Sequence, residues 1–487
     1  MLAVIIVLVA LVAILVGVVA WRTYTFPLPV TPIAPVELDP VEAASVAAHL
    51  SAVIQCETVS VTGPAPDAYA AFAALHRYLE DTYPRVHTAL TRHTINEWSL
   101  VYEWRGTAAD AAPIVFMAHQ DVVPIEPSSL GQWTHPPFSG AVAEGYVWGR
   151  GTLDIKTQLV GLLESAERLL EQGFQPERTL YFAFGHDEEI QGKQGACAIV
   201  KWFEAQEIRP AVVLDEGSVV VEDVLPGVQS PIAVVGVAEK RHTILRLSVE
   251  GEPGHASMPP QETTIALLAQ AIARVASHPL PATLTYVTLL FRYLGRTAPL
   301  AQRAVFANLW LMGPVVRRML AASPQTNALI RTTTTPTIIA GGRTENVLPH
   351  AASATFDCRL MPGDTPDSVS AVLRDIIADD RVQITIIAEG EPTASRLSPW
   401  DTAAFETLSA TIRQVFGALP VIPYLTAGAS DARHYTAICD KVYRFTPMHL
   451  HASDLDRIHG INERVSVENL GRMVQFYTQL MRSWGAS

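Results

Sequence analysis

The sequence contains few cysteines. Only 4 of the 487 residues are cysteine, and Cys56, Cys197, Cys358 and Cys439 lie far apart without a CxxC pair. This spacing excludes a thiolate zinc cluster and a dense disulfide framework. A metal ion bound by this chain would therefore have to be held by histidines and carboxylates.

Positive charge is also scarce. The 35 Lys and Arg residues stand against 48 Asp and Glu residues, so the net charge is −13. A phosphate backbone would be repelled over most of such a surface, and we expect no nucleic-acid partner. Hydrophobic residues make up 49% of the chain and charged residues only 17%, which excludes a disordered protein. A chain of this length has room for two or three folded units.

One long apolar run opens the chain. Residues 2–21 carry no charge, and as a helix they can cross a hydrocarbon layer of roughly 30 Å. We predict a single-pass transmembrane anchor at 1–22 and a proline-rich stalk at 23–40. A cleaved signal peptide is the alternative, but its apolar region usually has about 7–15 residues after a basic start. We expect the catalytic part to be extracytoplasmic, although Arg22 alone favours the cytoplasm.

Short apolar runs alternate with helical patterns beyond the stalk. Runs rich in β-branched and aromatic residues occupy 113–119, 179–186 and 211–217, and 157–173 has a helical pattern. This alternation predicts an α/β fold with a mixed, mostly parallel sheet that helices cover on both faces.

The pattern changes at about residue 241. We predict a catalytic domain in two parts, 41–240 and 391–487, with a small α+β lid or dimerisation domain inserted at 241–390. Within the lid, the apolar stretch 285–330 predicts amphipathic helices. We interpret it as ordinary lid core; the alternatives are an acyl-chain groove or a surface that rests on the membrane.

Polar residues follow each predicted strand. His119 and Asp121 lie two apart after the first strand, so Asp121 can accept a hydrogen bond from the imidazole and fix its tautomer. Alone, this pair is more typical of a structural histidine beside a turn-forming aspartate. Acidic residues 187–189 follow the second strand and acidic residues 215–216 follow the third. The alternative is that these carboxylates stabilise the N-termini of the helices that follow.

A glycine-rich turn at 149–154 ends in Asp154 and lacks the P-loop pattern. We predict that His119, Asp154, Glu189 and Asp215 lie at successive strand ends of one sheet, where they can converge. A second histidine, His459, lies near the other end of the chain and would complete two metal sites.

Several ordered motifs support this interpretation: MAHQDVVP (117–124), WGRGTLDIK (148–156), GHDEEIQG (185–192), LDEG (214–217), GEPGHASMP (251–259), ENVLP (345–349), ASDARH (429–434) and RIHGINERVSV (457–467). Over about residues 41–480 the sequence resembles the di-zinc peptidases and amidohydrolases that include aminoacylase, glutamate carboxypeptidase and carboxypeptidase S. The resemblance is strongest to the carboxypeptidase S branch, which includes enzymes acting on N-fatty-acyl amino acids.

The resemblance implies two zinc ions. Asp154 would bridge them, His119 and Asp215 would complete one site, and Glu189 and His459 would complete the other. Among the catalytic residues, Glu188 would be the general base and Asp121 would orient a ligand. The family also tends to have a cis peptide bond after the bridging residue, here Asp154.

The resemblance further implies residues that recognise the substrate. Arg433 is the first candidate for binding a substrate carboxylate and Arg359 the second, because a guanidinium pairs with a carboxylate through two hydrogen bonds. Gly428 would allow close backbone approach. His255 would polarise the scissile carbonyl, often from the second subunit of a dimer, and Asn346 would help it as an oxyanion donor.

The sequence thus predicts zinc-dependent hydrolysis of the amide of a C-terminal residue in peptides or of N-acyl amino acids, with the reverse synthesis allowed. The expected partners are this substrate, the membrane and, through the lid, a second copy of the chain. One alternative is an aminopeptidase or dipeptidase with the same metals, which would use an acidic residue instead of Arg433. Another is a non-catalytic binding protein on a peptidase scaffold, which would lack a ligand or the base.

Overall fold

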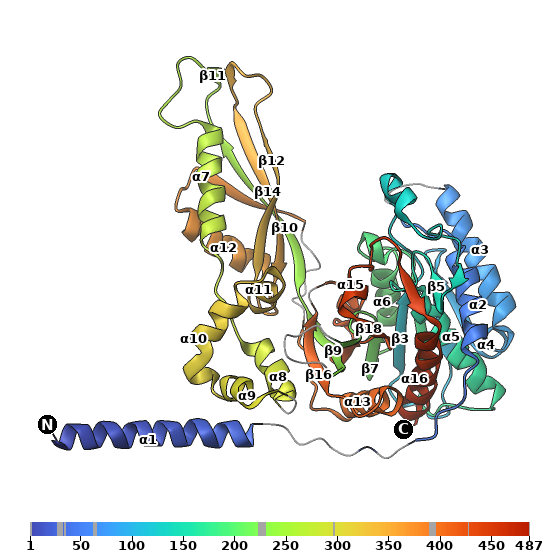
Figure 1. The fold of residues 1–487 in the computed structure, drawn as a ribbon. Helices are drawn as coiled ribbons and strands as arrows, with labels where there is room; N and C mark the ends of the chain where they lie inside the picture. Colours follow the sequence, from blue (N-terminus) through green and yellow to red (C-terminus); the bar gives the residue numbers. More distant parts are fainter. Residues whose placement is uncertain are drawn as a thin grey trace.

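The computed structural model describes residues 2–26, 33, 36–61, 66–222, 230–295, 298–388, 396–426 and 428–486. Figure 1 shows a long N-terminal helix, an elongated lid and a compact catalytic part that contains the C-terminus.

The N-terminal helix α1 (Leu2–Thr25) is long and apolar enough to cross a membrane, with a mean hydropathy of 3.5 in its most apolar window. A signal sequence meets the same criteria. The helix continues past the predicted anchor limit at residue 22 into the predicted stalk. Residues 27–32 and 34–35 of that stalk lie outside the described residues.

A mixed sheet forms the centre of the catalytic part. In spatial order its strands are β1 (Thr91–Ile95), β2 (Ser99–Trp104), β6 (Leu180–Gly185), β3 (Ile114–His119), β7 (Val212–Asp215), β17 (Val442–Arg444), β9 (Ile232–Glu239), β8 (Val220–Glu222) and β18 (His449–His451), and β16 (Val421–Thr426) also pairs with β9. The central strands β6, β3, β7 and β17 run parallel. The predicted mixed, mostly parallel sheet is confirmed.

Helices cover both faces of this sheet. One face packs against α2 (Ala43–Ile54), α3 (Pro66–Thr82), α4 (Pro84–Ala89), α5 (Lys156–Glu171), α13 (Ala403–Phe416) and α16 (Val467–Gly485); the other face packs against α6 (Ala196–Ala205) and α14 (Ala432–Tyr435). In α5, Leu159, Leu162, Leu163 and Leu169 are fully buried. Their spacing places them on the helix side that faces β3, so the apolar pattern itself directs the packing.

A small second sheet joins distant parts of the chain. Its strands are β4 (Val142–Ala143), β5 (Tyr146–Trp148) and β19 (Arg464–Ser466), and β5 pairs with β19. This pairing brings the loop before α5 next to the loop before β19. Three short helices complete this part: η1 (Pro127–Gln132), η2 (Glu188–Ile190) and α15 (Ala452–Leu455).

The lid is built on an antiparallel sheet. Its strand order is β12 (Thr333–Gly341), β14 (Ala351–Leu360), β10 (Arg241–Glu250) and β15 (Val382–Ala388), and α7 (Thr264–Ser277) and α12 (Pro366–Ile377) pack on it. The strands β11 (Gly254–His255) and β13 (Val347–Leu348) form its tip (Figure 1). The predicted domain limit at residue 390 lies outside the described residues, and the division into domains stays a prediction.

The stretch 285–330 forms four helices at the base of the lid: α8 (Thr285–Leu294), α9 (Leu300–Ala307), α10 (Leu309–Leu320) and α11 (Pro324–Ile330). They share a small apolar core that includes Val287, Phe291, Val316 and Ile330. Helix α9 also packs against the end of α1.

Candidate active site

Two histidines face the same carboxylate. His119 ends β3, and its Nε2 lies 3.0 Å from Asp154 Oδ1. His459 reaches the other oxygen, with its Nε2 2.9 Å from Asp154 Oδ2. Asp154 therefore lies between two histidines that are distant in sequence, as expected of a bridging ligand.

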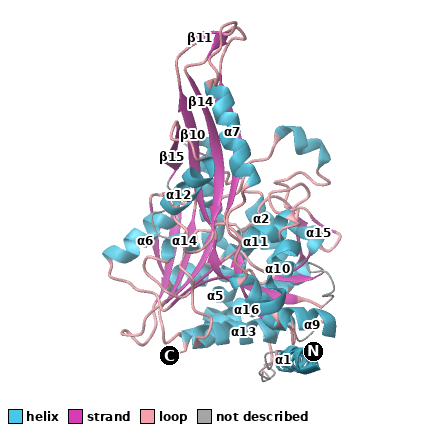
Figure 2. Cartoon of the chain, turned by 90° about the vertical axis from the view of Figure 1, so that its left-hand side faces the viewer, coloured by secondary structure: helices cyan, strands magenta, loops and turns pink. Residues whose placement is uncertain are grey.

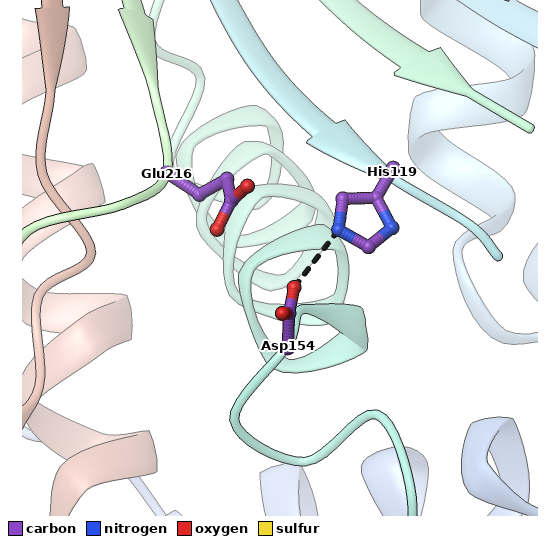
Figure 3. Close-up of side chains that lie close together, drawn as sticks. All are labelled: His119, Asp154 and Glu216. Carbon is purple, nitrogen blue, oxygen red and sulfur yellow. Dashed lines mark hydrogen bonds and ion pairs between the residues drawn. The ribbon is translucent and has the colours of Figure 1, made fainter. Parts of the chain in front are cut away.

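Two glutamates extend this cluster. Glu189 Oε2 lies 3.2 Å from His459 Nε2, and Glu189 Oε1 is buried without a hydrogen-bond partner among the described residues. On the other side, ligand atoms of His119, Asp154 and Glu216 lie within 4.8 Å of one another. Figure 3 shows these three side chains pointing toward a common centre.

Asp215 and Glu216 take different directions at the end of β7. Asp215 Oδ2 accepts a hydrogen bond of 2.7 Å from the backbone N–H of Ala432 in α14. Since successive side chains along a strand point to opposite sides, Glu216 turns toward His119 and Asp154. Among the described residues, the groups of candidate ligands include Glu216 and none includes the expected ligand Asp215.

The loop that carries Asp154 differs from the expectation in one respect. Asp154 lies between β5 and α5, so the prediction that it follows a strand of the central sheet is wrong. The turn needs glycine at Gly151, where φ is +92° and a Cβ would lie 2.9 Å from Val122 Cγ1. The peptide bond between Asp154 and Ile155 is cis.

A buried ion pair ties the two loops of the cluster together. Glu463 Oε1 accepts hydrogen bonds from the backbone N–H groups of Gly151 (3.0 Å) and Leu153 (2.7 Å). Its Oε2 pairs with Arg150 Nη1, and Arg150 Nη2 donates to the backbone oxygen of His459 at 3.0 Å. This pair positions the Asp154 and His459 loops. Sequence reasoning assigned neither residue a role, although Arg150 and Glu463 both lie within the quoted motifs.

Asp121 organises a third loop. His119 Nδ1 lies 2.9 Å from the backbone oxygen of Asp121 and 3.3 Å from its Oδ1. This arrangement favours the tautomer with a proton on Nδ1 and leaves Nε2 free to bind a cation. The Asp121 carboxylate also accepts the backbone N–H groups of Glu188 and Glu189 at 3.1 Å each, so it orients both glutamates.

The cluster has an excess of negative charge. Burial raises the pKa of Glu188 and of Glu216 well above the usual value, and neighbouring carboxylates act in the same direction. Hydrogen bonds to Asp154 and Glu189 raise the pKa of His459 to about 10. Crowded carboxylates thus favour positive charge at this centre. Imidazole nitrogens and carboxylate oxygens are ligands that divalent metals accept, and with the unpaired Glu189 Oε1 the residues fit a metal centre.

Arg433 lies beside the candidate base. Its Nη1 is 3.9 Å from Glu188 Oε1, and its guanidinium donates to the backbone oxygens of Ser430 and Gln191, at 2.7 Å each. These bonds hold the side chain at the edge of the cluster. Gly428 is exposed, and a Cβ there would meet nothing within 4 Å, so the geometry does not require glycine there.

The remaining expected residues belong to the lid. Arg359 lies on β14 and its Nε pairs with Asp357 Oδ1 at 3.0 Å. His255 on β11 and Asn346 beside β13 lie at the tip, where Asn346 O accepts the N–H of Ala256. Figure 1 places this tip at the top of the molecule, far from the strand ends of the catalytic part. Within one chain, the structure does not bring His255 and Asn346 to the cluster.

A histidine–carboxylate cluster at the edge of a helix-covered parallel sheet, with a buried acid beside it, defines the chain as a metallohydrolase. More specifically, the chain belongs to peptidase family M20/M25/M40, whose sequence profile matches residues 115–483. The resemblance expected from the motifs is thereby confirmed.

Relatives with assigned names support the same placement. The chain is 42% identical to the "Probable carboxypeptidase S-like 2" of Dictyostelium discoideum, over 85% of this chain and 79% of that protein. It is 37% identical to an "N-fatty-acyl-amino acid synthase/hydrolase" of Xenopus tropicalis, over 96% of this chain and 93% of that protein.

A solved structure shares the fold. The M20 family metallo-carboxypeptidase Sso-CP2 of Sulfolobus solfataricus superposes with a TM-score of 0.66 at 17% identity, covering 91% of this chain and 99% of that chain. At this identity the likeness supports the fold of the catalytic part and lid.

Proposed function

We propose that this protein hydrolyses the amide bond next to a free carboxylate, either of a C-terminal residue in a peptide or of an N-acyl amino acid. The observation that carries the proposal is the contact between Glu188 and Arg433, whose Oε1 and Nη1 atoms lie 3.9 Å apart at the edge of the cluster. A proton acceptor and a carboxylate-binding group are thus neighbours. The relatives named as carboxypeptidase S-like and as an N-fatty-acyl-amino acid synthase/hydrolase support both substrate classes.

We assign two zinc ions to the cluster. Asp154 would bridge them; His119 and Glu216 would complete one site, and Glu189 and His459 the other. Asp215, which the family resemblance suggested as a ligand, would instead hold α14 through Ala432. When bound, such a pair lowers the pKa of a water molecule and polarises the scissile carbonyl.

Glu188 acts as the general base in this proposal. Its backbone is fixed by Asp121, and its side chain, beside ligand atoms of His119 and Glu189, would take a proton from the attacking water. It would then deliver that proton to the leaving nitrogen. Arg433 would meanwhile hold the substrate carboxylate through charge-assisted hydrogen bonds. No covalent intermediate is needed.

The alternative is an aminopeptidase or dipeptidase with the same metals. Such an enzyme binds the free amine of its substrate and would use an acidic residue next to the base. The residue observed beside Glu188 is the cation Arg433, which favours recognition of a carboxylate.

We further propose that His255 and Asn346 act on the cluster of a second copy of the chain. Both lie at the exposed tip of the lid, His255 on β11 and Asn346 just before β13, which pairs with β11. A homodimer through the lid would supply the carbonyl-polarising groups that a single chain holds far from its own cluster.

The helix α1 would anchor this enzyme as a single-pass membrane protein with an extracytoplasmic catalytic part. Its length and hydropathy support the anchor. In sealed vesicles that retain their cellular orientation, added protease should then remove the catalytic part only from the extracytoplasmic side.

The decisive experiment replaces the base. Glu188→Gln should lower kcat by about 10²–10⁴-fold, while elemental analysis still finds two zinc ions per chain. Glu204→Gln, an exposed glutamate on α6, is the matched control and should leave kcat unchanged. Retained activity in Glu188→Gln would refute the assignment of the base. Faster cleavage of amine-terminal substrates that lack a free carboxylate would favour the aminopeptidase.

A further inference from the structure

Helix α10 exposes an apolar face. Leu311, Val315 and Met319 are 45%, 51% and 68% exposed, and because they are four residues apart they lie on one side of the helix. Trp310, 54% exposed, lies in the first turn of the helix, on a side next to that of Leu311. We call Trp310, Leu311, Val315 and Met319 the α10 stripe.

An adjacent side of α10 is apolar as well. Val316 is buried in the small core at the base of the lid, together with partly buried Met312 and Leu320. The apolar arc of α10 is therefore wider than the small core covers, and its exposed part is typical of a helix with a second apolar neighbour. The lid core therefore explains one side of α10 and leaves the α10 stripe unexplained.

The start of α10 is bonded to the end of α1. Asn308, the residue before α10, donates from Nδ2 to Val19 O and Thr23 Oγ1, at 3.3 Å each. Arg22 Nε donates to Ala307 O at 3.0 Å, and Thr23 is only 4% exposed. The point at which α1 leaves the lid thus lies one helical turn or less from Trp310 and Leu311.

Helix α10 lies on the side of the molecule from which α1 projects. In Figure 1, α10 is at the left of the lid base, and α1 projects beyond it in that direction. In Figure 2, which views the molecule from that side, α1 is seen nearly end-on below α9 and α10. A bilayer crossed by α1 along its axis would therefore begin where α10 lies.

We propose that the α10 stripe docks on the lipid bilayer into which α1 inserts, so that the lid base has a second, interfacial contact with the membrane. The proposal rests on the proposed membrane anchor and is independent of the proposed hydrolysis.

The composition of α10 fits a bilayer surface. Tryptophan is enriched at the level of the lipid headgroups, and Trp310 lies two residues after Asn308, which is bonded to the C-terminal end of α1. Arg317 and Arg318 are exposed in the last turn, where they can contact anionic headgroups while Val315 and Met319 enter the acyl boundary.

The test uses the full chain reconstituted into vesicles of phosphatidylcholine and phosphatidylserine. A fluorophore on Met319→Cys reports the α10 stripe, and one on Met258→Cys, an exposed methionine (79%) near the lid tip, is the matched control. Labelled wild type measures the background from Cys56 and Cys197, which are partly exposed. A third label on Val9→Cys reports insertion of α1.

Lipids with a quencher near the headgroup should quench the Met319→Cys label several-fold more than the Met258→Cys label. Replacing Arg317 and Arg318 by glutamine should reduce that quenching, and phosphatidylcholine alone should reduce it too. Val9→Cys should be quenched only by lipids with a quencher deep in the chain.

Three outcomes would overturn the proposal. If Val9→Cys is quenched and Met319→Cys is not, α1 is inserted but α10 does not touch the bilayer. If the Met319→Cys emission responds to protein concentration and not to quencher lipids, the stripe binds a second copy instead. If neither label is quenched, α1 is not in the bilayer and the docking proposal fails with the anchor, while amide hydrolysis, measured separately, is unaffected.

Discussion

The catalytic part and the lid hold their functional side chains in different ways. In the catalytic part, His119 is 1% and Glu189 7% exposed, and their partners come from segments far away in sequence. At the lid tip, His255 is exposed and its Nδ1 accepts a hydrogen bond from the nearby Ser257 N–H. The first environment is formed within one chain, whereas the second is open to solvent; in the proposed dimer, a second copy of the chain would complete it.

In the proposed function, this difference separates two kinds of contribution to one reaction. Charges in the cluster are desolvated and interlocked, so each residue there affects its neighbours strongly. Residues at the tip can be changed without disturbing the fold, because few contacts depend on them. The predictions below test that contrast, beginning with the largest expected effect.

The largest effect is expected at the end of β7. Glu216→Gln should remove one of two metal ions and lower kcat/KM by about 10³-fold or more, because a metal ion contributes several kcal/mol of transition-state stabilisation. Asp215→Asn should keep both ions, since Asp215 faces Ala432. Elemental analysis and steady-state kinetics check both variants. Loss of metal from Asp215→Asn alone would reinstate Asp215 as the ligand.

Replacing His255 at the lid tip should lower the reaction rate strongly without changing the fold. His255→Ala should lower kcat by about 10²–10³-fold, as expected for a lost donor to the developing oxyanion, with unchanged metal content and thermal stability. His278→Ala, another exposed lid histidine at the end of α7, is the control. Mixed dimers of His255→Ala and Glu188→Gln chains should regain part of the activity; if they stay inactive, each chain uses its own tip.

A smaller effect is expected at the carboxylate-binding residue. Arg433→Ala should raise KM about tenfold or more, because a hydrogen bond to a charged group contributes about 1.5–3 kcal/mol. Arg359→Ala should leave KM unchanged, since that side chain pairs with Asp357 on the lid. Substrates with an amidated carboxylate should show no difference between wild type and Arg433→Ala. A raised KM in Arg359→Ala instead would move the role to the lid.

The smallest effect concerns a charge pair away from the cluster. His49 on α2 is bonded to Glu164 on α5, and this bond raises the pKa of His49. The unfolded-state pKa is about 6.5, so the stabilisation is fully present below that pH and is lost as the pH rises through the higher folded-state pKa. Because His49 is only half-buried, His49→Gln should cost no more than about 1 kcal/mol at low pH.

Thermal melts of wild type and His49→Gln at several pH values check this prediction. The difference in stability should be largest below pH 6.5 and should shrink at higher pH. A difference that grows with pH would show that the pair is not stabilised by the histidine charge.

Much of the fold was predictable because its signals are local. The apolar runs that became β3, β6 and β7 are continuous because both faces of these strands are buried. The pattern that became α5 is a short-range helical periodicity with a buried side. The signal for α1 is local too, because its apolar length is read directly from residues 2–21. The position of His119 at a strand end follows from these patterns.

The direction of neighbouring side chains was not predictable in this way. Asp215 and Glu216 are adjacent acids, and only the backbone N–H of Ala432, far along the chain, decides which one faces His119. Asp154 likewise reaches the cluster from a loop outside the central sheet.

The sequence by itself determined most of the elements, the family and most of the candidate ligands, because hydrophobic periodicity and motif spacing are properties of short segments. The tertiary structure decided which of those ligands meet. The Arg150–Glu463 pair joins the Asp154 and His459 loops across 313 positions, and the lid carries His255 away from its own cluster. Both depend on contacts between segments distant in sequence, and no local pattern encodes the geometry of such contacts.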